Sequence, residues 1–134
     1  MSRRPLTWLL PVLAAALCYQ GTLDAGFAFD DPVAVIDNPL VDGRLPAVEA
    51  LSRSFWGDRP GFEHLASWRP LTVWSLRLDH VLGGGEPGAF HTTNLLLLLA
   101  LVFAVVRLGL RWGLSPWGAG MAVSYTHLTL PTKA

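Results

Sequence analysis

The sequence predicts an all-α integral membrane protein with two transmembrane helices, the start of a third, and an exported loop that carries short amphipathic helices. Charged residues make up only 15% of the 134 residues, whereas ordinary soluble proteins have about 25%. Two apolar runs, one near each end, approach the length of about 20 residues that a spanning helix needs. All ten acidic residues lie between Asp24 and Glu86. This partition predicts cytoplasmic ends and an exported central loop, because basic flanks stay in the cytoplasm.

Residues 1–23 are expected to form the first transmembrane helix. Arg3 and Arg4 precede an apolar run that is barely long enough to span, and Pro11 would bend it. A cleaved signal peptide is the alternative, because a charged start and a short apolar centre are typical of one. We favour the anchor, since a second apolar span follows.

Residues 24–90 form the exported loop, too polar to span and too apolar to be disordered. Within it, Asp37-Asn38-Pro39 predicts a turn. Two short helices are predicted, one from Pro46 to Gly57 and one from Pro70 to Gly83. The first would carry four apolar residues near the helical period: Val48, Leu51, Phe55 and Trp56. The second would place four on one face: Leu71, Trp74, Leu78 and Val81. Such a face would lie on the membrane surface, pack against the spans, or belong to an ordinary core.

Residues 91–111 are predicted to form the second transmembrane helix, with Arg107 and Arg111 reaching the far headgroups. Residues 112–123 look like the start of a third helix that is too short to cross. The polar tail at 124–134 resembles, from Val123 to Leu128 (VSYTHL), the translation of a sequencing adapter. We therefore expect the natural protein to continue beyond Val123.

The candidate catalytic pair is Asp30-Asp31, which follows the short apolar segment Phe27-Ala28-Phe29. Adjacent like charges repel each other, and near an apolar boundary both lose hydration, a setting typical of acids that transfer protons. The alternative is that both acids solvate a loop or cap a helix, since Asp before Pro is an ordinary turn signal.

Four pieces of sequence occur in an order that resembles a known family. They are Phe29-Asp30-Asp31 with Asp37-Asn38-Pro39, then Phe55-Trp56-Gly57, then Trp68-Arg69-Pro70-Leu71-Thr72, then Phe90-His91-Thr92-Thr93-Asn94. Together they look like the N-terminal part of the membrane glycosyltransferases with tetratricopeptide repeats, similar to the protein O-mannosyltransferase-like members of the GT-C fold class. The resemblance covers roughly Leu6 to Val123.

The resemblance implies a polytopic enzyme that uses a polyprenyl-phosphate-linked sugar donor and no cofactor, with a protein, lipid or glycan as acceptor. In the family, an acidic motif in the first exported loop carries catalysis, and here this motif matches Asp30 and Asp31. One of the two would take the proton of the acceptor hydroxyl. Arg69 would bind the donor phosphate through its guanidinium fork, or else pair with Asp58, Glu63 or lipid headgroups.

His91 and Asn94 stand one helical turn apart and would line the site or cap the helix. We predict no metal, because the spacing of His64, His80 and His91 matches no usual ligand pattern. The family often has a further histidine where this chain has Leu98, and the repeats and later spans are absent. The chain as given is therefore expected to be inactive by itself.

Two other functions compete with the transferase. The first is a non-enzymatic membrane anchor or scaffold of a tetratricopeptide-repeat protein, and the second is a transporter fragment. A transporter predicts ionisable residues inside the spans, yet there are none between Leu95 and Val106. The net charge of zero gives no indication of nucleic-acid binding. We expect an integral membrane protein, in the bacterial inner membrane, with a cytoplasmic N-terminus.

Overall fold

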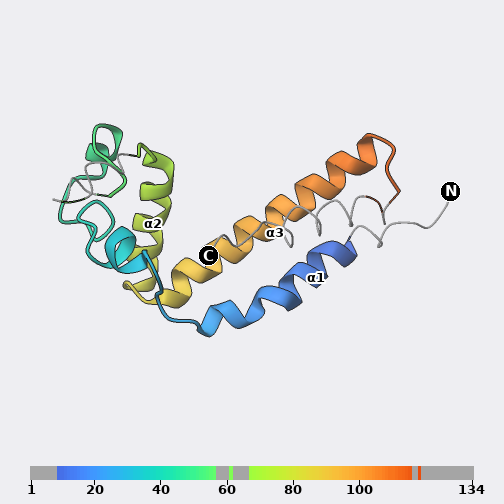
Figure 1. Cartoon of the computed structure of the whole chain (residues 1–134), viewed down its shortest axis with the longest axis horizontal. Helices are drawn as coiled ribbons and strands as arrows, with labels where there is room; N and C mark the ends of the chain where they lie inside the picture. Colours follow the sequence, from blue (N-terminus) through green and yellow to red (C-terminus); the bar gives the residue numbers. More distant parts are fainter. Residues whose placement is uncertain (1–8, 57–60, 62–66, 116–117, 119–134) are drawn as a thin grey trace. The chain divides into compact units, whose positions relative to one another are not determined.

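The computed structural model describes residues 9–56, 61, 67–115 and 118, and every regular element in these ranges is a helix (Figure 1). The all-α prediction is therefore confirmed for the described part of the chain. The described residues fall into two compact units. The loop unit is Thr22–Thr93, and the helical unit combines Met1–Gly21 with Asn94–Ala134. The tail at 124–134 and most of the expected third helix lie outside the described residues.

The helical unit is built on apolar contacts between α1 (Leu9–Tyr19) and α3 (Pro87–Arg111). Val102 and Val106 of α3 are buried, and apolar residues of both helices surround them: Val12, Ala15, Leu98, Val105 and Leu110. Most of the remaining leucines of α3 are exposed. An apolar helix that leaves its leucines uncovered has a surface suited to lipid or to further helices.

The long apolar helix α3 confirms that the chain has a segment able to cross a membrane. It has 25 residues, which corresponds to about 37 Å at the α-helical rise, against a hydrocarbon core of about 30 Å. It begins at Pro87 rather than at His91, because proline is well suited to the first turn of a helix. The N-terminal apolar helix, Leu9–Asp24, is shorter. The first span, and with it the number of spans, stays a prediction.

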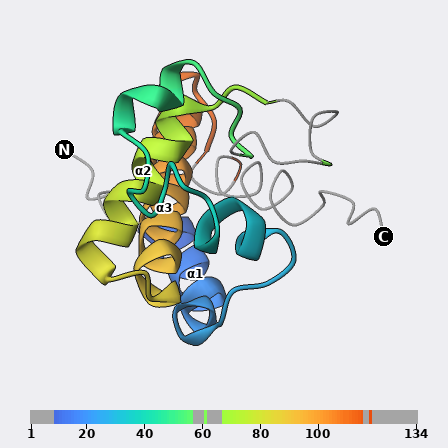
Figure 2. The same cartoon turned by 90° about the vertical axis from the view of Figure 1, so that its left-hand side faces the viewer.

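The loop unit contains three short helical segments and one longer helix (Figure 2). Their order is the end of η1 (Gln20–Asp24), a single π-turn η2 (Pro32–Ile36), a 3₁₀ turn η3 (Ala47–Leu51) and α2 (Pro70–Gly83). Figure 2 shows η3 beside α2, which it contacts. One apolar core joins these segments to the first turn of α3 through its buried residues: Ala34, Val35, Leu40, Val41, Ala50, Phe55, Val73 and Phe90.

The two helices predicted in the loop have different outcomes. The helix from Pro70 to Gly83 is confirmed at both ends, because proline opens it and Gly84 closes it in the left-handed conformation at φ 64°. The helix from Pro46 to Gly57 is wrong in length and type. Helix η3 ends at Leu51, because the Phe55 amide donates instead to the Ser67 carbonyl, 2.7 Å away.

The apolar face of α2 points away from the core of the loop unit. Its four predicted members are between 36% and 75% exposed: Leu71, Trp74, Leu78 and Val81. The opposite face packs inward through Val73, which is 1% exposed. The alternative of an ordinary core helix therefore does not hold for this face.

Candidate functional site

The candidate acids lie on a tight turn, Ala28–Asp31, which we call the acidic turn. The Asp31 amide donates to the Ala28 carbonyl at 3.0 Å, and the Ala28 amide donates to Asp31 Oδ2 at 2.9 Å. Between them Phe29 has a φ of 51°. The left-handed region costs a residue with a Cβ about 1–2 kcal/mol. The two reciprocal hydrogen bonds hold this strained backbone in place.

The two carboxylates have different surroundings. Asp31 is partly buried and its carboxylate accepts the Ala28 amide. Asp30 is exposed, and no hydrogen bond or ion pair of its carboxylate is found among the described residues. Its main-chain carbonyl accepts the amides of Val33 and Ala34, which begins η2. Neither acid caps a helix through its side chain, since Asp31 precedes η2 without such a bond.

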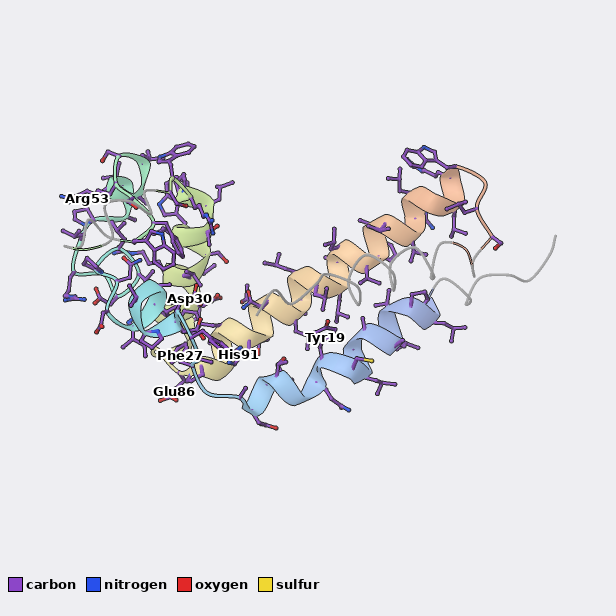
Figure 3. The ribbon with its side chains drawn as sticks, in the orientation of Figure 1. Tyr19, Phe27, Asp30, Arg53, Glu86 and His91 are labelled. Atoms are coloured by element: carbon purple, nitrogen blue, oxygen red, sulfur yellow. The ribbon has the colours of Figure 1, made fainter. Side chains whose placement is uncertain are left out.

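Phe27 anchors the acidic turn to the start of α3. Its ring meets that of Phe90 edge to face, with the centroids 5.5 Å apart, and Phe90 belongs to the buried core of the loop unit. Figure 3 shows Phe27 and His91 at the start of α3, and Asp30 on the turn that follows Phe27. The acids are thus held beside the first turn of the one described helix that is long and apolar enough to span.

Asn38 connects the segments of the loop unit that follow the acidic turn in the sequence. Its side chain is completely buried and makes three hydrogen bonds. The amide group donates to the carbonyls of Ala34 at 3.1 Å and Phe55 at 2.8 Å, and Oδ1 accepts the Leu40 amide at 3.0 Å. The Asp37-Asn38-Pro39 and Phe55-Trp56 pieces therefore meet in space, although their residues are far apart in the chain.

Arg69 precedes α2 and is exposed. Its guanidinium carbon lies 5.4 Å from the centroid of the Phe55 ring, within the range of a cation–π contact. The suggested partners Asp58 and Glu63 lie outside the described residues. The segment Trp68–Thr72 lines an open cavity of about 310 Å³. Arg69 is thus a cation at a cavity, and its role toward a phosphate stays a prediction.

His91 and Asn94 both lie on α3, in its N-terminal part. His91 Nε2 is buried and has no hydrogen-bond partner in the described structure, while Asn94 is exposed. Leu98, where the family often has a histidine, packs in the apolar cluster of the helical unit. No hydrogen bond or ion pair among the described residues joins Asp30, Arg69 and His91.

No cluster of three metal-ligating side chains exists among the described residues, and His64 lies outside them. The sequence-based prediction missed three polar residues that build the loop unit: Asn38, Arg77 and Asp79. Arg77 donates to the carbonyls of Leu40 and Leu45. The Asp79 carboxylate is buried and accepts the Thr93 hydroxyl at 2.6 Å. The available signal for Arg77 and Asp79 was that each is a charged residue on an otherwise apolar helix.

No model of a known protein family matches the chain, and no solved structure is similar to it. Curated relatives are similar over most of its length. The chain is 38% identical over 135 residues to the fruit-fly (Drosophila melanogaster) protein O-mannosyl-transferase Tmtc1, an alignment that covers 95% of this chain and 16% of the relative. For Drosophila Tmtc2 the identity is 38%, over 87% of this chain and 13% of the relative.

The human relative, protein O-mannosyl-transferase TMTC4, is 35% identical over 107 residues, which cover 73% of this chain and 14% of that protein. The chain therefore spans about one sixth or less of the length of these relatives. It is homologous to the Tmtc protein O-mannosyl-transferases over most of its own length and corresponds to a small part of them, as expected of a fragment.

Proposed function

We propose that this chain is part of a membrane protein O-mannosyl-transferase, which moves mannose from a polyprenyl-phosphate-linked donor to a hydroxyl group on protein. The homology supports this class of reaction, because the relatives that match 73–95% of the chain are named protein O-mannosyl-transferases. A lipid or glycan acceptor is the alternative within the same chemistry. The rest of the enzyme would come from sequence that the 134 residues do not contain.

Within this reaction we assign the base to Asp30 and the support of the turn to Asp31. The observation that carries the assignment is the difference between the two carboxylates. Asp31 accepts a hydrogen bond that closes the acidic turn, whereas Asp30 is exposed and has no described side-chain partner. A general base must have its carboxylate free to meet the acceptor hydroxyl.

The proposed mannose transfer needs few protein side chains. The Asp30 carboxylate takes the hydroxyl proton while the acceptor oxygen forms a bond to the anomeric carbon of the sugar. The bond from that carbon to the phosphate oxygen breaks, and the polyprenyl phosphate leaves with the electron pair. Arg69, at its open cavity, would bind the phosphate oxygens. His91 and Asn94 would line the site. Neither a metal nor a cofactor enters this scheme.

The proposed topology places the N-terminus in the cytoplasm, residues 24–90 on the exported side, and residues 91–111 across the membrane. It rests on the confinement of all ten acids to the segment from Asp24 to Glu86. The relatives compared come from animals, and the bacterial inner membrane stays a prediction.

A non-enzymatic anchor or scaffold is the second candidate, and the uncovered apolar face of α2 favours it. This face would dock a partner, while the acids would only solubilise the loop. The two functions differ in what Asp30 and Asp31 do, since the first needs a reactive carboxylate and the second needs only charge and polarity.

The experiment that separates them replaces Asp30 and Asp31 together with Asn in the complete protein encoded by the gene. Transfer of labelled mannose from polyprenyl-phosphate mannose is then measured in membranes. We expect a fall of at least about 100-fold, with membrane insertion unchanged. The matched control is Asp24→Asn, a substitution of another exposed loop acid, which should leave transfer intact. Undiminished transfer by the double variant would favour the scaffold.

A further inference from the structure

The Phe29 side chain takes no part in the apolar core of the loop unit. It is completely exposed, and it is the one described residue other than glycine with a positive φ. Two residues earlier, Phe27 packs against Phe90 and the core. The chain thus packs the Phe27 ring against the core and holds the Phe29 ring in solvent, on a strained backbone. Strained residues persist where the surrounding structure enforces them, and they concentrate at functional positions.

The chemistry of the ring indicates the kind of partner. A phenyl ring has no donor or acceptor, so a contact that compensates for its exposure must be with hydrocarbon. Phe29 neighbours the exposed Asp30, so a bilayer that covered the ring would have its polar boundary at this turn. Segments that lie on a membrane surface bury Phe, Trp and Leu side chains at the boundary between headgroups and acyl chains.

The position of the acidic turn along α3 indicates where this hydrocarbon comes from. The Phe27–Phe90 contact fixes the acidic turn at the start of this helix. The residues from His91 to Asn94 are polar, and an unbroken leucine run begins at Leu95. At the helical rise, Phe90 and Leu95 are about 7.5 Å apart along the axis. Along α3, the residue that anchors the acidic turn therefore precedes the leucine run by less than two helical turns.

We propose that Phe29 is a membrane-contact residue, whose ring enters the acyl chains of the bilayer at its surface and thereby holds the Asp30 carboxylate at the level of the lipid headgroups. This contact is with bulk membrane lipid and does not depend on the transferase reaction. The reciprocal hydrogen bonds of the acidic turn keep the ring directed outward. Phe29 is on this account a positioning residue, and it takes no part in bond making.

The direct test replaces Phe29 with the photoreactive p-benzoylphenylalanine in the full chain, reconstituted in phosphatidylcholine vesicles. The same group at Ser52, an exposed residue of the loop unit, is the control. Illumination should join position 29, but not position 52, to phosphatidylcholine. Absence of a lipid adduct at position 29 would overturn the proposal. So would an adduct that forms only when polyprenyl phosphate is added, since the contact would then be with the donor lipid.

A second measurement tests the effect on Asp30. In a Cys18→Ser background, Asp30→Cys is labelled with a membrane-impermeant maleimide. Phe29→Asn tolerates the left-handed backbone but removes the ring, and should speed labelling about tenfold, because burial of one ring shifts an equilibrium at least that far. Phe29→Trp keeps an apolar ring and should label at the original rate. Equal rates for the Asn and Trp variants would contradict the positioning role, whatever the adduct experiment gives.

Discussion

Replacement of Asn38 with Ala removes the side chain on which the loop unit depends most. The side chain is completely buried and connects η2, the following turn and the Phe55 backbone through three hydrogen bonds. The substitution leaves two carbonyl oxygens and one amide without partners in the interior. It changes neither the charge of the chain nor any residue assigned to the chemistry.

The magnitude follows from these three groups. A buried polar group left unsatisfied costs about 1–3 kcal/mol, and water that enters the space left by the side chain recovers part of this cost. We therefore expect the free energy of opening of the loop unit to fall by about 3–5 kcal/mol. Since 1.4 kcal/mol is a factor of ten, amide exchange in this unit should accelerate by about 100-fold or more.

The assay is hydrogen exchange followed by mass spectrometry, on the full chain in phosphatidylcholine nanodiscs. The informative amides are those of Val41 and Asp42, which donate to the Asn38 main-chain carbonyl. Asn94→Ala is the matched control, because Asn94 is exposed on α3, and surface substitutions change stability by less than about 0.5 kcal/mol. Exchange in the Asn38 variant within about threefold of the unaltered chain would refute the reasoning.

Two further predictions concern the hydrogen bonds made by Arg77 and Asp79 of α2. Arg77→Met keeps the aliphatic stem but loses the hydrogen bonds to the Leu40 and Leu45 carbonyls, so the stability of the loop unit should fall by about 2–4 kcal/mol. The same hydrogen-exchange experiment measures this loss, and unchanged protection of the amides would contradict it. Thr93→Val removes the hydroxyl that donates to the buried Asp79 carboxylate and should lower the stability by about 1–3 kcal/mol. Thr93→Ser keeps a hydroxyl and should retain nearly all the stability. Equal thermal unfolding of the two variants would show that this hydrogen bond contributes nothing.

The helix ends and the apolar character that depend on neighbouring residues were predicted from the sequence. Pro70 and Gly84 set the ends of α2, because proline fits the first helical turn and glycine adopts the left-handed C-cap. The leucine-rich composition of α3 predicted its apolar character and its end at Arg111, but not its start at Pro87. The spacing of the apolar residues of α2 also predicted a common face, but not that this face would be uncovered, since periodicity does not say which side of a helix meets the core.

Long-range contacts were beyond prediction. Helix η3 ends early because Phe55 pairs with Ser67, a bond that no helical spacing reveals. Asn38 resembled an ordinary turn residue, yet its amide reaches Phe55, seventeen positions away. The sequence singled out Asp30 and Asp31 together without distinguishing them. The difference arises from the fold of the acidic turn, in which only Asp31 can reach back to the Ala28 amide.

The most direct test of the central claim compares Asp30→Asn and Asp31→Asn as single variants of the complete protein, by the rate of mannose transfer from polyprenyl-phosphate mannose. Asn at position 31 can still accept the Ala28 amide, so the acidic turn should survive and the rate should stay within about tenfold of the unaltered protein. Asn at position 30 should lower the rate by about 100-fold to 10,000-fold. An active Asp30 variant beside an inactive Asp31 variant would contradict the assignment of the base.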